Sequence, residues 1–202
     1  MTTTPDTYQT IELPGSAEFT DRGSRFLAFS FPIENKDNFK SRMAGIKAVH
    51  PKATHFCFAY RLGLTRDMFR AGDDGEPAGT AGKPILGQID SKQLTNVLVV
   101  VVRYFGGSLL GVPGLVNAYK TAASLVLQVT PVVQKQVEAR YEIQFDYTEM
   151  NDIMQVLKQY NCRIIEQDAQ LFCRIVTGIP VNRVEATMNR LAATRAVLKL
   201  VA

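Results

Sequence analysis

The stretch VVVVRYFGGSLLGVPGLVNAY at residues 99–119 decides how the middle of the chain folds. Its beginning belongs to a β-branched run, Thr95–Arg103, which is typical of a strand buried on both faces. Its end opens Leu115–Val129, where apolar residues recur at spacings of four and three and predict a helix. Pro113 suits the first turn of this helix, and Pro131 ends it. We therefore expect a buried strand that leads through a glycine-rich turn into a long helix.

The chain before this stretch alternates between strand and helix patterns. A helix is predicted over residues 36–49, with Asn35 at its N-cap and Pro51 after its end. Residues 71–84, AGDDGEPAGTAGKP, predict a long irregular loop, and Pro84 can open a short helix after it. Four segments are predicted to be strands: Tyr8–Leu13, Ala17–Asp21, Ser24–Ile33 and Thr54–Leu62.

Past about residue 137 the pattern indicates a second, smaller unit. Its predicted order is βαββαβ, the ferredoxin-like arrangement, and a tight turn at Asp168 and Ala169 joins the middle strands. The sequence thus predicts an α+β protein with two domains, residues 1–136 and 137–202. The six predicted elements are strand 138–147, helix 150–160, strands 163–167 and 170–176, helix 181–191 and strand 196–201.

Composition excludes several classes of protein. The 202 residues are 46% hydrophobic and 21% charged, which is too apolar for a disordered chain. The net charge is +4, and no run of Lys or Arg forms a polybasic arm. Three cysteines without motif spacing argue against a disulfide scaffold, and neither a signal peptide nor an apolar stretch of membrane-spanning length is present. We expect a cytoplasmic protein with no membrane partner.

The loop at residues 73–83 carries the first candidate motif. Asp73, Asp74 and Glu76 could hold a divalent cation or act as acid and base, although the spacing of an EF-hand is absent. The glycines that follow, with Thr80 and Lys83, would let backbone amides approach a phosphate. The alternative is a solvated acidic turn. No cofactor is expected, and a divalent metal at these three carboxylates is the alternative.

The glycine-rich turn after Arg103 carries the second candidate motif. A glycine loop between a strand and a helix N-terminus offers free N–H groups and a favourable dipole to an anion. The registers of a Walker loop and of a dinucleotide-binding loop are both absent. The alternative is therefore a tight, closely packed turn.

Isolated residues give weaker indications. His55 could serve a nucleophile such as Cys57 or Thr80, but no signature supports such a pair. Arg25 and Arg61 stand beside aromatic residues and could pair and stack on RNA, although strands commonly carry such neighbours.

Four blocks of the sequence resemble the signature of the YigZ/IMPACT family: GSRFLA at 23–28, THFCFAYR at 54–61, DDGEPAGTAGKPIL at 73–86, and residues 99–119. The resemblance implies an N-terminal domain like the second domain of a small-subunit ribosomal protein. It also implies a C-terminal domain similar to a C-terminal domain of elongation factor G. Eukaryotic members modulate translation by interfering with activation of a stress kinase at the ribosome. The resemblance thus implies RNA, the ribosome or a protein of the translation machinery as partner.

Three positions depart from the usual family pattern. Leu109 stands where members carry Lys, Pro113 where they carry Gly, and Asn117 where they often carry Arg. Two groups that could contact phosphate are therefore missing from this loop.

Two functions remain open. The first is a non-catalytic, translation-associated binding protein. The alternative is an enzyme for a phosphorylated small molecule, with a metal on the acidic loop and phosphate on the glycine loop. No catalytic residue is assigned, and the candidate binding surface comprises Arg25, His55, Arg61, Asp73, Asp74, Glu76, Thr80, Lys83, Arg103, Tyr104, Gly106, Gly107, Gly111, Gly114 and Tyr119.

Overall fold

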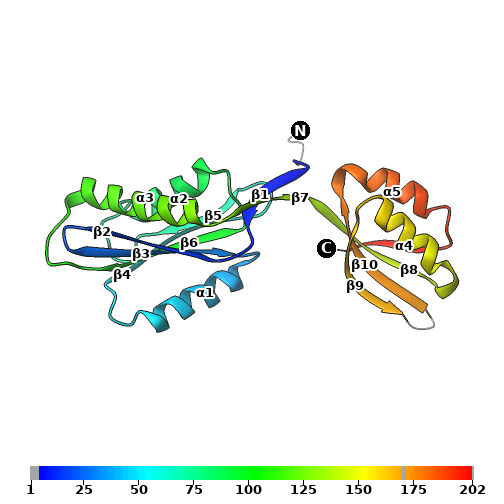
Figure 1. The fold of residues 1–202 in the computed structure, drawn as a ribbon, viewed down its shortest axis with the longest axis horizontal. Helices are drawn as coiled ribbons and strands as arrows, with labels where there is room; N and C mark the ends of the chain where they lie inside the picture. Colours follow the sequence, from blue (N-terminus) through cyan, green and yellow to red (C-terminus); the bar gives the residue numbers. More distant parts are fainter. Residues whose placement is uncertain (1–4, 170–171, 202) are drawn as a thin grey trace. The chain divides into compact units, whose positions relative to one another are not determined.

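A computed structural model describes residues 5–169 and 172–201 of the chain (Figure 1). Backbone contacts divide it into two compact units, Tyr8–Lys135 and the residues from Gln136 onward. Residues 5–7, which the sequence analysis placed with the first domain, group with the second unit. The reason is that the Val137 N–H donates to the carbonyl of Asp6 at 2.8 Å.

The N-terminal unit is built on an antiparallel sheet of five strands in the order β2-β3-β6-β4-β5. The central strand is β6, and its residues 97–102 are fully buried, which confirms the prediction from the β-branched run. Residues Ala71 and Gly72, expected to lie in a loop, complete β5. The strands are β2 (Gly15–Asp21), β3 (Ser24–Pro32), β4 (His55–Leu62), β5 (Met68–Gly72) and β6 (Val97–Tyr104).

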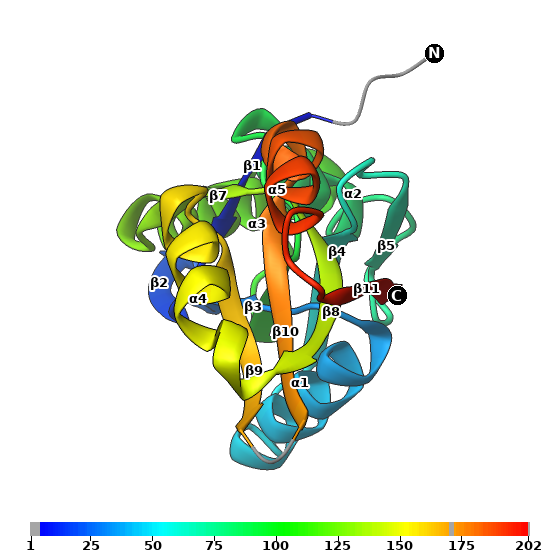
Figure 2. The ribbon, with the colours of Figure 1, turned by 90° about the vertical axis from the view of Figure 1, so that its right-hand side faces the viewer.

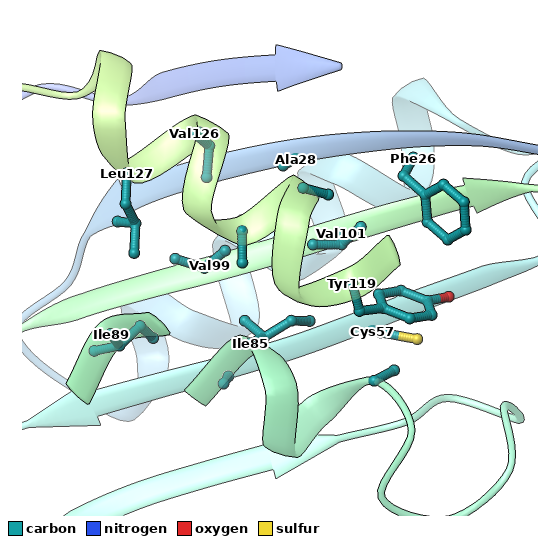
Figure 3. Packing of buried hydrophobic residues seen from close by; sticks show 14 of the residues in the cluster. Phe26, Ala28, Cys57, Ile85, Ile89, Val99, Val101, Tyr119, Val126 and Leu127 are labelled. Carbon is teal, nitrogen blue, oxygen red and sulfur yellow. The ribbon is translucent and has the colours of Figure 1, made fainter. Parts of the chain in front are cut away.

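Three helices cover this sheet, and Figure 1 shows α1 on one face and α2 and α3 on the other. Helix α1 (Lys36–Val49) begins at Asn35, whose side chain accepts hydrogen bonds from two N–H groups of the first turn. Helix α2 (Gly82–Ser91) begins two residues before the expected Pro84. Helix α3 (Gly111–Val129) packs with α2 over a core of aliphatic residues and Tyr119 (Figure 3).

A short two-stranded sheet pairs β1 (Thr7–Ile11) with β7 (Val132–Gln136). No sequence pattern predicts β7, whose residues VVQKQ follow Pro131.

The C-terminal unit has the predicted element order βαββαβ. Its sheet is antiparallel, in the order β11-β8-β10-β9, and Figure 2 shows these strands side by side. Buried residues of both helices pack with Ile143 and Ile175 of the sheet in one core. The elements are β8 (Glu138–Asp146), α4 (Met150–Gln159), β9 (Arg163–Ala169), β10 (Phe172–Pro180), α5 (Val184–Leu191) and β11 (Val197–Val201).

The predicted turn at Asp168 and Ala169 is wrong. Both residues belong to β9, where they pair with Arg174 and Cys173 of β10. Strand β9 reaches Ala169 and β10 begins at Phe172, and the expected start of the next strand at Gln170 lies outside the described residues. Among the helices of the described segments, none is both long and apolar enough to cross a membrane.

Candidate functional site

The loop between β5 and α2 is organised around the carboxylate of Asp73. This carboxylate accepts hydrogen bonds from the N–H groups of Gly79 at 2.9 Å, Ala81 at 3.0 Å and Gly82 at 2.8 Å. Burial alone would raise the pKa of Asp73, but these three donors and the charge of Lys83 hold it below its ordinary value. Asp73 thus fills the anion position at the N-terminus of α2.

Asp74 fixes the start of β4. One oxygen of its carboxylate accepts a hydrogen bond from the Phe56 N–H at 2.7 Å. Its backbone carbonyl lies 2.8 Å from Nδ1 of His55, so Nδ1 carries the proton of that bond. The second ring nitrogen of His55, Nε2, then lies 3.9 Å from Oε1 of Glu76.

Glu76 is buried, with a side chain only 4% exposed. Its Oε1 accepts from Nη1 of Arg103 at 2.6 Å and from the Tyr119 hydroxyl at 2.7 Å. Because a buried charge without a partner is costly, this ion pair ties the loop to β6 and α3. Glu76, Arg103 and Tyr119 thus meet in one buried network, although 43 positions separate the first of them from the last. We call these three residues the Glu76 network.

Arg103 also links the loop to the turn between β2 and β3. Its Nη2 donates to Oγ of Ser24 at 3.3 Å, and the Gly106 N–H donates to the same oxygen at 3.2 Å. The guanidinium lies over the rings of Phe26 and Phe105, 5.4 and 5.5 Å from their centroids.

The Tyr119 hydroxyl of the Glu76 network and the neighbouring Cys57 thiol are poor nucleophiles. Figure 3 shows the Tyr119 ring and the Cys57 side chain together at one end of the core. Burial raises the pKa of Cys57 to about 12, and burial, followed by the neighbouring Cys57, raises the pKa of Tyr119 as well. Both groups stay protonated at neutral pH.

The glycines after Arg103 stand where the chain leaves little room for a side chain or takes a positive φ angle. A Cβ on Gly106 would lie 1.9 Å from the carbonyl carbon of Gly23, so no side chain fits there. Gly107 and Gly111 have φ angles of +86° and +71°, a region that side chains disfavour. A Cβ on Gly114 would lie 3.1 Å from that of Leu110. These contacts favour the interpretation as a closely packed turn.

Three apolar side chains are exposed in the turn after Arg103 and the first turn of α3. The exposed fractions are 48% for Phe105, 85% for Leu109 and 56% for Val112. Lys83, in the first turn of α2, is exposed as well. We call Phe105, Leu109 and Val112 the apolar tip.

Several candidates lie away from this network. The exposed Arg25 pairs with Glu18 across neighbouring strands. Arg61 pairs with Asp90 of α2, six residues along β4 from His55 and so about 20 Å away. The Tyr104 hydroxyl lies 2.9 Å from Nδ1 of His50, and Thr80 donates to the carbonyl of Pro77 at 2.7 Å.

The three carboxylates proposed for a metal do not gather around a common centre. Asp73 and Asp74 accept from backbone N–H groups, whereas Glu76 accepts from Arg103 and Tyr119. Within residues 5–169 and 172–201, no group of three or more His, Cys, Asp or Glu side chains could hold a metal ion. The arrangement instead holds two loops against the sheet.

Sequence reasoning missed two members of this arrangement. Ser24 accepts from Arg103 and Gly106, and Oγ1 of Thr54 accepts from the Phe105 N–H at 3.3 Å. A signal for Ser24 existed, because strand alternation places it on the same buried face as Phe26.

Comparisons with known proteins agree on one family. The Impact N-terminal domain matches residues 22–127. An IMPACT family member of Haemophilus influenzae is 35% identical over 83% of this chain and 82% of its own length. IMPACT family member YigZ of Escherichia coli is 35% identical over 84% of each chain. A solved structure described as a hypothetical protein is 30% identical, with a TM-score of 0.75 over 98% of both chains. The chain therefore belongs to the IMPACT family.

Proposed function

We propose that this protein is a translation-associated regulatory protein that acts by binding RNA, the ribosome or a ribosomal factor. Membership of the IMPACT family supports the association with translation, since the resemblance to this family implies a role in translation. A role in translation also implies a cytoplasmic protein. The observation that carries the binding function is which side chains of the two loops are engaged within the protein and which are exposed. The carboxylates of Asp73 and Glu76 are engaged by donors of the protein itself, and the apolar tip faces solvent.

The geometry favours binding over catalysis for a physical reason. The Glu76 carboxylate already accepts two short hydrogen bonds, and the Asp73 carboxylate accepts three. A proton or a metal ion on either carboxylate would weaken the charge-assisted bonds that fix the loops. Exposed apolar side chains, by contrast, mark surfaces that gain from contact with a partner.

The N-terminal unit is the better place for this contact. In the C-terminal unit, the strand residues that face away from the helices include Glu142, Gln144 and Arg174. RNA-binding sheets of βαββαβ topology usually stack bases on aromatic residues at such central positions.

The element order and sheet order support a ferredoxin-like domain, similar to a C-terminal domain of elongation factor G. In the same way, the IMPACT resemblance supports a ribosomal-protein-like N-terminal fold.

Sedimentation with ribosomes tests the proposal. The variant Leu109→Ser with Val112→Ser removes two residues of the apolar tip without touching the Glu76 network. A matched control, Leu13→Ser with Val49→Ser, removes the same residue types from sites that are 67% and 71% exposed. We expect the wild type and the control to pellet with ribosomes and the tip variant to stay in the supernatant.

Titration of labelled ribosomal RNA separates RNA from a protein partner. Each neutralised phosphate of a single strand contributes about −0.7 to the slope of log affinity against log salt, and we expect roughly two to four contacts. Wild-type protein that neither pellets with ribosomes nor binds RNA at low salt would contradict the proposal.

A further inference from the structure

Strand β5 offers an unpaired backbone edge. It stands last in the sheet order β2-β3-β6-β4-β5, and of the described strands it pairs with β4 alone. One row of N–H and C=O groups from Met68 to Gly72 therefore has no strand beside it. Such an edge is a template onto which another extended segment can add.

The side chains of β5 differ between the two faces of the sheet. Arg70 pairs across the strands with Tyr60, which packs in the core beneath α1. Phe69 pairs with Arg61, which binds Asp90 of α2 on the opposite face. The Arg61 guanidinium lies 4.9 Å from the centre of the Phe69 ring, although this ring is 56% exposed. The strand thus presents a cation on one face and an aromatic ring on the other.

A cavity of about 380 Å³ opens beside this strand, on its α1 side. Its cations, Lys36 and Arg70, form no ion pair within the described residues. Its one carboxylate, Asp67, accepts a hydrogen bond from Thr65 at 2.6 Å. The cavity is lined by Lys36, Tyr60, Asp67, Met68, Phe69 and Arg70.

We propose that β5 binds an extended segment of a partner protein, which adds to the sheet as a sixth strand and carries an acidic side chain opposite Arg70. Main-chain hydrogen bonds along Met68–Gly72 supply the affinity. Lys36 and Arg70 select a carboxylate on the α1 face, and Phe69 selects an apolar side chain on the other face. The bound segment therefore alternates acidic and apolar residues.

The opposite edge of the same sheet lacks these features. On β2, the outward charge of Glu18 is already paired with Arg25 at 2.8 Å. Helix α3 packs along β2, where Phe19 joins the core that the two helices cover. The choice of β5 thus follows from Arg70 and the nearby Lys36, which form no ion pair within the described residues, and from the exposed Met68 and Phe69.

Two peptides as long as β5 test this surface. One alternates glutamate with valine, and the other alternates lysine with valine. Their binding to the full chain is measured by fluorescence anisotropy, with amide exchange of Met68–Gly72 as the local readout. The protein variant is Lys36→Glu with Arg70→Glu. The matched control is Lys92→Glu with Lys120→Glu, which reverses two charges elsewhere.

We expect the glutamate peptide to bind the wild type and the control, and to slow amide exchange along β5. The Lys36→Glu/Arg70→Glu variant should lose at least about tenfold in affinity and bind the lysine peptide instead. Failure of both peptides, equal binding of both, or binding that ignores the charge reversal overturns the proposal. Labelled oligouridine that competes for the same residues would make RNA the occupant and overturn it too. None of these residues belongs to the apolar tip, so this test and the ribosome test fail separately.

Discussion

An arginine–glutamate pair occurs in each unit of the molecule, in opposite surroundings. In the N-terminal unit, the side chains of Arg103 and Glu76 are 6% and 4% exposed. In the C-terminal unit, Arg174 is 42% exposed and shares Glu142 and Glu166 across the strands of the sheet. The same two residue types therefore form a buried ion pair in one unit and solvent-exposed ion pairs in the other.

The difference follows from the surrounding solvent. Water screens the pairs of Arg174, and if Arg174 is lost, Glu166 stays 62% exposed and Glu142 keeps the Gln144 side-chain amide as a donor. The Glu76 side chain is only 4% exposed, so removal of Arg103 leaves a buried carboxylate whose remaining donor among the described residues is Tyr119. The buried pair holds two loops in place, whereas the exposed pairs join neighbouring strands at the surface of a sheet. The following predictions test this contrast, from the largest effect to the smallest.

Replacing Arg103 by Ala should lower the free energy of unfolding by about 3–5 kcal/mol, because it leaves Glu76 buried and unpaired. Urea unfolding measures this loss. The matched control is Arg25→Ala, an arginine whose partner Glu18 is exposed. Equal shifts in the two midpoints would contradict the contrast.

Gly106→Ala should destabilise by at least about 1–3 kcal/mol, since its Cβ would lie 1.9 Å from a backbone atom of Gly23. Gly45→Ala in α1 is the control, because a Cβ there meets nothing within 4 Å. That change should stabilise the helix by up to about 1 kcal/mol. Thermal melts of both variants decide whether the turn needs a close backbone approach.

Asp73→Asn should cost about 1–3 kcal/mol at pH 7, because an amide cannot accept from all three N–H donors. The folded-state pKa of Asp73 lies below its ordinary 3.8, so the charged form stabilises the fold above that pH. This contribution is lost as the pH falls through the folded-state pKa. The difference between the two proteins should therefore shrink below about pH 4 in urea titrations. A constant difference down to pH 2 would show that Asp73 does not act through its charge.

Arg174→Ala should give the smallest effect, a midpoint that matches the wild type within error, because Glu166 stays exposed and Glu142 keeps the Gln144 side-chain amide as a donor. Chemical denaturation with urea at low and high salt measures it. A large loss that persists at high salt would show that the exposed pairs carry stability after all.

Local patterns predicted the elements whose residues carry a clear signal of their own. The β-branched run predicted the buried central strand, and Asn35 predicted the start of α1. Strand β5 escaped prediction because three of its five residues are exposed, and a loop of glycines follows it. Strand β7 is equally short, and three of its five residues are exposed. It forms because β1, distant in the sequence, pairs with it, whereas β5 pairs with the preceding strand β4.

The site was predicted residue by residue but not as an arrangement. The motifs named Asp73, Glu76, Arg103 and Tyr119, yet they suggested a metal or a phosphate. Glu76 meets Arg103 across 27 positions and Tyr119 across 43. No spacing within a motif indicates that such residues neutralise one another, because only the packing of β6 and α3 brings them together.

A double-mutant cycle on Glu76→Gln and Arg103→Met tests the central claim most directly. If the two side chains exist to hold one another in the core, removing both leaves no buried unpaired charge. The double variant should then be more stable than the sum of the single losses predicts, by at least about 1 kcal/mol of coupling in urea unfolding. Losses that add to within about 0.5 kcal/mol would show that the two groups act independently, and would contradict the account.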